Sequence, residues 1–162
     1  MKIYKEGLEK YPLTHIIGQN IFLLIYFWIG IIGMLPLKIY GFPIISVIYG
    51  LFIVIMLLFV LRKYLCTNCY YYGKLCNTGW GKVSALMFKR DSGNINFGLK
   101  LAKITWMLIT IIPIIVMSFE VYLRMMDFLI LGIFIIMSGL NFLIHNRMCK
   151  KCKMKFICNS KE

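Results

Sequence analysis

Four long apolar segments constrain the fold of this chain more than any other feature of its sequence. An α-helix needs about 20 apolar residues to cross ~30 Å of hydrocarbon. The segments cover residues 16–35, 42–61, 104–119 and 125–144. Because the third is short, we expect it to gain a helical turn from 99–103, whose lysines reach the membrane interface. The sequence therefore predicts an all-α membrane protein with four transmembrane helices.

Composition supports this membrane class. Hydrophobic residues make up 60% of the 162 residues, whereas soluble domains are about 45–50% apolar. Abundant Ile, Leu, Phe and Tyr exclude a disordered chain. The first apolar segment is longer than the ~7–15-residue core of a signal peptide, and no small-residue cleavage site follows it. We therefore expect this segment to be retained as a span.

The distribution of basic residues predicts which side of the membrane each connection faces. Of the 19 Lys and Arg residues, 17 fall in segments 1–15, 62–103 and 145–162, and the other two are Lys38 and Arg124. Cytoplasmic connections concentrate Lys and Arg, so we expect both termini and the central loop in the cytoplasm of a multi-pass cell-membrane protein. The same rule accounts for the net charge of +13, and nucleic acid is not an expected partner.

Each half of the chain reads as two spans followed by a cysteine cluster. Shifting the first half by 83 residues places Cys66 on Cys149 and Cys69 on Cys152. An internal duplication would relate two parallel hairpins by an axis along the membrane normal and would bring the clusters together; chance similarity is the alternative. The predicted parts are an N-terminal segment, hairpin 1, a cysteine-rich loop, hairpin 2 and a cysteine-rich tail, at 1–15, 16–61, 62–103, 104–144 and 145–162.

The six cysteines form two triplets of nearly equal spacing. Cytosolic thiols stay reduced, so paired Cys-x-x-Cys segments there indicate metal binding or redox chemistry rather than disulfides. Two intervening residues allow a tight turn that directs both thiolates at one ion. The sequence predicts a zinc site, with an iron–sulfur cluster as the alternative. Its candidate ligands are Cys66, Cys69, Cys76, Cys149, Cys152 and Cys158.

The spacing leaves three ligand arrangements open. The two Cys-x-x-Cys pairs can form one four-thiolate site, or each triplet can hold its own ion, with His145 as a fourth ligand of the second triplet. Six thiolates can also share two ions. In this respect the spacing resembles that of the fungal-type binuclear zinc-cluster modules, in which two cysteine triplets hold two zinc ions. The resemblance covers the cysteines alone, and DNA binding is not expected to carry over.

No pattern specifies a reaction, and no catalytic residue is assigned. The middle of each span lacks the ionisable residues of proton relays and ion paths. Ser46, Thr110, Ser138 and Asn141 are explained by hydrogen bonds between helices. We expect a scaffold or accessory subunit with structural zinc, embedded in the lipid bilayer, whose basic face docks a cytosolic protein or anionic lipid. The alternatives are a membrane redox protein using an iron–sulfur centre or reversible dithiols, and a small lipid or solute carrier.

Overall fold

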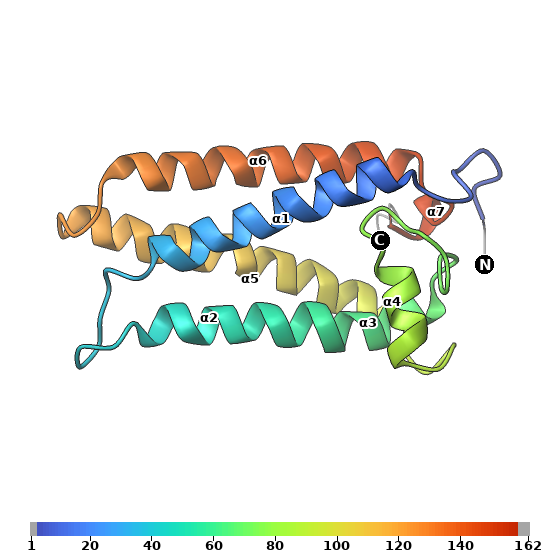
Figure 1. The fold of residues 1–162 in the computed structure, drawn as a ribbon, viewed down its shortest axis with the longest axis horizontal. Helices are drawn as coiled ribbons and strands as arrows, with labels where there is room; N and C mark the ends of the chain where they lie inside the picture. Colours follow the sequence, from blue (N-terminus) through green and yellow to red (C-terminus); the bar gives the residue numbers. More distant parts are fainter. Residues whose placement is uncertain (1–2, 159–162) are drawn as a thin grey trace.

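The computed structural model describes residues 3–158, with side chains described as far as Phe156. These residues form a bundle of long helices (Figure 1). Four helices are long and apolar enough to cross a membrane, namely Leu13–Gly33, Ile44–Asn68, Ile95–Tyr122 and Phe128–Lys150. No strand occurs in the described part of the chain, which contains only two isolated β-bridges. The prediction of an all-α protein with four membrane-length helices is confirmed.

Three of the spans are single helices and the second is composite. The single helices are α1 (Leu13–Gly33), α5 (Ile95–Tyr122) and α6 (Phe128–Lys150). The second span consists of α2 (Ile44–Val54), the π-helical segment η1 (Ile55–Val60), α3 (Leu61–Tyr64) and the 3₁₀ turn η2 (Cys66–Asn68). Two short helices, α4 (Trp80–Met87) and α7 (Lys155–Cys158), lie outside the spans.

The start of the third span differs most from the prediction. Helix α5 begins at Ile95 rather than in the expected region 99–104. The side chain of Asn94 caps it by accepting hydrogen bonds from the backbone N–H groups of Asn96 and Phe97, at 3.0 and 3.2 Å. An Asn cap satisfies donors that have no partner inside the helix. The first turns of α5 are therefore helical although they are too polar to register as membrane sequence.

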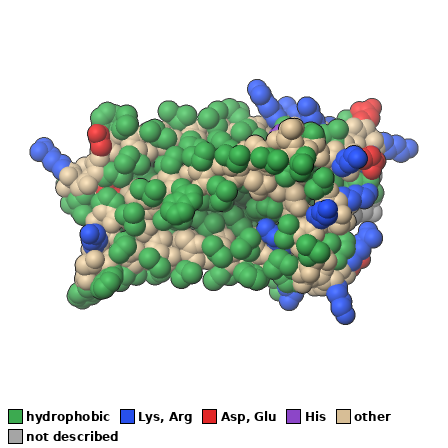
Figure 2. All heavy atoms as spheres, in the orientation of Figure 1, with side chains coloured by type: hydrophobic (Ala, Val, Ile, Leu, Met, Phe, Trp, Pro, Cys, Tyr) green, Lys and Arg blue, Asp and Glu red, His purple; other side chains and the backbone are tan. Residues whose placement is uncertain are grey.

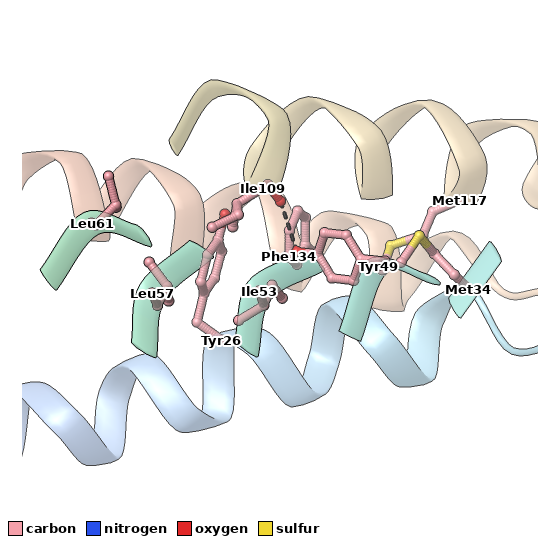
Figure 3. Close-up of a cluster of buried hydrophobic side chains, with 9 residues drawn as sticks. All are labelled: Tyr26, Met34, Tyr49, Ile53, Leu57, Leu61, Ile109, Met117 and Phe134. Atoms are coloured by element: carbon pink, nitrogen blue, oxygen red, sulfur yellow. Dashed lines mark hydrogen bonds between the residues drawn. The ribbon is translucent and has the colours of Figure 1, made fainter. Parts of the chain in front are cut away.

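The bundle core lies where all four spans meet. Helix α1 packs against α2, α5 and α6, and α5 packs against α6 and α3. The Tyr26 and Phe134 rings stack with centroids 4.9 Å apart, and the Tyr49 hydroxyl donates to the Ile109 carbonyl at 2.8 Å (Figure 3). Because α1 also contacts helices distant from it in the chain, the division into two hairpins stays a prediction.

The outer surface of the bundle is apolar along the spans and basic at one end. Figure 2 shows hydrophobic side chains over the length of this face, and most of its Lys and Arg side chains gathered at the end where α4 and α7 lie in Figure 1. Trp28 and Ile136, for example, are 59% and 65% exposed. A soluble monomer rarely exposes apolar surface on this scale, so these side chains contact lipid.

Three segments distant in sequence meet at the basic end of the bundle. They are the N-terminal segment, the central loop with α4, and the C-terminal tail (Figure 1). We refer to residues 3–12, 66–94 and 149–156 together as the cap. It contains every described cysteine side chain.

Candidate functional site: the cysteine-containing cap and the cavity beneath it

The N-terminal segment lies between the central loop and the tail and bonds to both. The Leu8 N–H donates to the Lys151 carbonyl, and the Tyr11 N–H donates to the Leu75 carbonyl, each at 3.0 Å. Sequence reasoning treated this segment only as a source of positive charge. Because the segment is short and has no periodic pattern, its sequence could not predict that it would bond to the loop and the tail.

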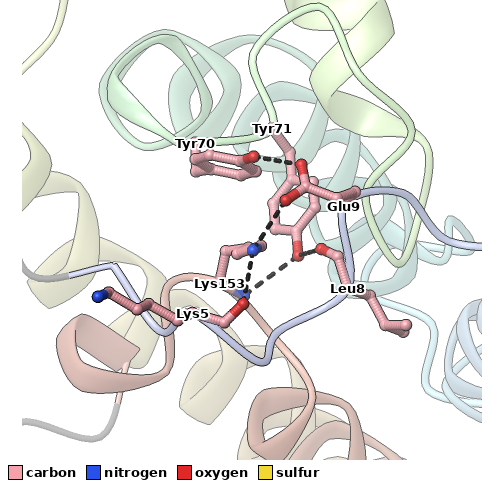
Figure 4. Close-up of polar contacts among 6 residues, drawn as sticks. All are labelled: Lys5, Leu8, Glu9, Tyr70, Tyr71 and Lys153. Atoms are coloured by element: carbon pink, nitrogen blue, oxygen red, sulfur yellow. Dashed lines mark hydrogen bonds and ion pairs between the residues drawn. The ribbon is translucent and has the colours of Figure 1, made fainter.

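Tyr71 is the buried hub that joins the three cap segments. Its side chain is only 2% exposed. Its hydroxyl donates to the Leu8 carbonyl at 2.6 Å and accepts from the Lys153 backbone N–H at 3.1 Å (Figure 4). Burial raises the pKa of Tyr71 above its ordinary value, so the phenol stays protonated and keeps its donor.

An ion pair lies beside this hub. The Lys153 ammonium is 2.8 Å from Glu9 Oε1 and also donates to the Lys5 carbonyl at 2.9 Å (Figure 4). The Tyr70 hydroxyl donates to the other oxygen of Glu9. Hydrogen bonds from Lys153 and, second, from Tyr70 lower the pKa of Glu9 below its ordinary value. The ionised carboxylate therefore helps to hold the N-terminal segment.

Acidification is expected to loosen the N-terminal segment. Because the pKa of Glu9 is lowered in the folded state, its contribution is present above the unfolded-state pKa and is lost as the pH falls through the folded-state value. Hydrogen exchange of a peptide covering residues 3–12, corrected for intrinsic rates, should show protection declining over that acid range. In Glu9→Gln, protection should already be lower at neutral pH. Glu6→Gln, whose carboxylate accepts from the Tyr4 hydroxyl, is the control and should follow the unsubstituted protein. Protection independent of both pH and Glu9 would contradict this role.

Cysteines from both clusters pack against one small apolar cluster. Its buried members are Tyr11, Ile16 and Tyr71, and the cysteines that pack against it are Cys69, Cys76 and Cys152. Cys69 and Cys152 lie within electrostatic range of Tyr71, and Cys149 and Cys152 lie within range of Tyr11. The loop and the tail thus present thiols to the same pair of tyrosines.

Backbone amides are directed at two of the sulfurs. The Gly81 N–H donates to Cys76 Sγ, and the Met154 N–H donates to Cys152 Sγ, each at 3.4 Å. Hydrogen bonds to the charged form of a group favour that form, and metal-binding cysteines are thiolates. Such donors therefore favour the thiolate form of both cysteines.

The remaining cysteines have different surroundings. Cys66 lies within electrostatic range of Cys69 and Cys76. The guanidinium of Arg62, over the Trp80 ring at 5.3 Å, places positive charge near Cys66 and Cys76. In the tail, Cys149 Sγ is 3.4 Å from His145 Nε2. Cys158 ends α7, and its side chain lies outside the described residues.

Metal binding stays a prediction. Within the part of the chain whose side chains are described, no group of three or more His, Cys, Asp or Glu side chains is arranged to hold an ion. The pairing of His145 with Cys149 leaves its predicted role as a ligand open.

A cavity of about 520 Å³ lies beneath the cap, between α1, α5 and α6. Its wall includes Gln19, Lys103 and Asn141. Two of the polar residues expected to hydrogen-bond between helices do so: Ser138 donates to the Tyr26 hydroxyl, which also bonds Thr110. Ser46 on α2 likewise donates to a carbonyl of α1. Asn141, by contrast, lines this cavity, which the hydropathy of its span could not predict.

The four apolar helices, the apolar outer surface and the basic end define an all-helical, multi-pass membrane protein in contact with the lipid bilayer. No family model, curated protein or solved structure matches the chain. The site geometry is therefore the basis for a functional conclusion.

Proposed function

We propose that this protein is a small membrane scaffold or accessory subunit whose cytoplasmic cap is stabilised by structural zinc. The observation that carries the proposal is the packing of Cys69 and Cys152, one from each cluster, around Tyr71. An ion shared between the loop and the tail would hold together segments that otherwise depend on a few hydrogen bonds. Structural zinc contributes directly to the stability of small domains.

The surroundings of the thiols favour a ligand set that differs from the three arrangements suggested by the cysteine spacing. Cys69, Cys149 and Cys152 all lie near the Tyr11 and Tyr71 pair. We propose that zinc binding draws these three thiols together as ligands, with Cys158 as the fourth because it is the remaining thiol of the tail. Cys66 and Cys76 are not among the thiols within electrostatic range of Tyr11 or Tyr71, and they are outside the proposed set.

Charge supports a cytoplasmic position for the cap. The basic side chains gather at the cap end (Figure 2), and cytoplasmic connections concentrate such residues. A reducing cytosol also keeps thiolates available for metal. The expected partner of the cap is accordingly an acidic surface of a cytosolic protein.

Metal analysis of protein purified anaerobically in detergent tests the proposal. We expect one zinc per chain and no visible absorption band. Cys69→Ser and Cys152→Ser should each lose most of the zinc, because each removes one of four thiolates from a tetrahedral site. Cys76→Ser, the matched control from the same loop, should keep it.

Other results would contradict the proposal in distinct ways. Iron with charge-transfer absorption would identify a redox centre instead of a structural zinc site. Absence of metal, with Cys69→Ser folded as the unsubstituted protein is, would remove the structural role of the thiols. Equal zinc loss in Cys76→Ser would overturn the ligand set while retaining a metal site.

A further inference from the structure

The cavity beneath the cap extends along α5 and is large enough for a small molecule. Residues from α1, α5, α6 and the loop at Asn77 and Thr78 form its wall. On α5 the lining extends from Leu99 to Thr110, which spans about 16 Å at ~1.5 Å per residue. The cavity therefore reaches from the membrane interface well into the hydrocarbon. Its volume of about 520 Å³ falls within the range of small-molecule sites.

The inner part of the cavity is apolar and open toward lipid. Leu23 and Trp106 form part of its wall. Met107 on α5 and Phe142 on α6 also line it, and they are 53% and 65% exposed. Because both side chains are accessible from outside the bundle, an acyl chain can enter the cavity directly from the bilayer.

Two polar side chains in the cavity lack protein partners. Gln19 is only 7% exposed. Within the described residues, neither its side-chain amide nor that of the half-buried Asn141 makes a hydrogen bond, and both residues line the cavity. Buried polar groups are nearly always hydrogen-bonded. These amides are therefore available to the oxygens of a ligand.

The charge of the site favours an anion. Lys103 is the one Lys, Arg, Asp or Glu residue among the described residues of the wall. Its ammonium forms no ion pair with any described carboxylate. The mouth is held in shape by side chains of α1, because Asn20 donates to the Thr78 carbonyl at 3.0 Å and His15 bonds Asn77. A fixed mouth with one unpaired cation suits a phosphate group.

From these features we infer that the cavity binds an anionic phospholipid. One acyl chain lies along Trp106, Met107 and Phe142, and the phosphate lies at Lys103. Gln19 and Asn141 donate to the ester or phosphate oxygens. This inference concerns a site separate from the cysteines and does not rest on the proposed zinc.

Quenching of Trp106 by brominated lipid tests the inference in the full chain. Trp28→Phe and Trp80→Phe leave Trp106 as the one emitter, since the sequence has three tryptophans. The protein is reconstituted in phosphatidylcholine vesicles that contain equal fractions of brominated phosphatidylglycerol or brominated phosphatidylcholine. We expect about fivefold preference for phosphatidylglycerol, as one lysine contributes to the binding of an anionic lipid. Lys103→Gln should abolish the preference.

The controls separate a built site from general attraction to the basic surface. Lys100→Gln removes an exposed lysine of the same helix that does not line the cavity, and it should retain the preference. Loss of the preference in Lys100→Gln, its persistence in Lys103→Gln, or equal quenching by both lipids would each overturn the inference. Excess inorganic phosphate at constant ionic strength should have no effect. If it removes the preference, the site takes a soluble phosphate and the lipid assignment is wrong.

Discussion

Replacing Gly81 with alanine is expected to displace α4 from the turn at Tyr71 within the cap. A Cβ at this position would lie 2.1 Å from the Tyr71 carbonyl oxygen and 2.9 Å from that of Lys74. Both atoms belong to the backbone, so rotation of a side chain cannot relieve the clash. The shift would also disturb the hydrogen bonds of Gly81 to Gly73 and to Cys76 Sγ. Overpacking of this kind destabilises by about 1–3 kcal/mol, and we expect the upper end.

Thermal unfolding in detergent measures this effect, with two glycine positions as matched controls. At Gly18 and Gly139 an added Cβ meets no heavy atom within 4 Å. Both lie inside helices, where alanine is favoured over glycine by about 1 kcal/mol. Gly18→Ala and Gly139→Ala should therefore melt at or above the midpoint of the unsubstituted protein. A Gly81→Ala variant that melts with them would show that the packing of α4 against the Tyr71 turn is looser than described.

Tyr71→Phe is expected to release the N-terminal segment from the cap. The change removes only the hydroxyl, but that oxygen satisfies both the Leu8 carbonyl and the Lys153 N–H. A buried group that loses its partner costs about 1–3 kcal/mol. The two losses fall on the two segments that Tyr71 joins, so undocking of the N-terminal segment is the direct consequence.

Hydrogen exchange and limited proteolysis of the N-terminal segment measure the release. Protection of residues 3–12 should fall in Tyr71→Phe, and a protease should cleave there sooner. Tyr72→Phe is the matched control, because it removes one hydroxyl that donates to the Phe88 carbonyl and does not contact the N-terminal segment. If residues 3–12 are equally protected from exchange in Tyr71→Phe and Tyr72→Phe, the Tyr71 hydroxyl does not hold the N-terminal segment in the cap.

The spans could be located from the sequence because a helix in hydrocarbon must satisfy its own backbone and present apolar side chains. Their ends were harder to predict. Helix α5 starts early because Asn94 caps it and because Gly98 lets it approach the Tyr64 backbone closely. The cap depends on one side chain and the close approach on tertiary packing, and an average over hydropathy detects neither.

The sequence also indicated which residues belong to the cap but not how they are arranged. Cysteine spacing and the gathering of basic residues placed both clusters at one end of the bundle. Nothing in the pattern indicated that residues 3–12 would lie between the loop and the tail. That arrangement depends on isolated contacts such as the Leu8 N–H to the Lys151 carbonyl, which leave no periodic signature.

The sequence by itself determined the four spans and the charge asymmetry between their ends, because each depends on local composition against the bilayer. Only the tertiary structure decided which helix faces turn inward. Lipid is as apolar as a protein core, so hydropathy cannot distinguish the two faces of a span. Helix α6 illustrates this, since Phe134 is its one fully buried residue. For the same reason, the convergence of Gln19, Lys103 and Asn141 on one cavity required the packed bundle.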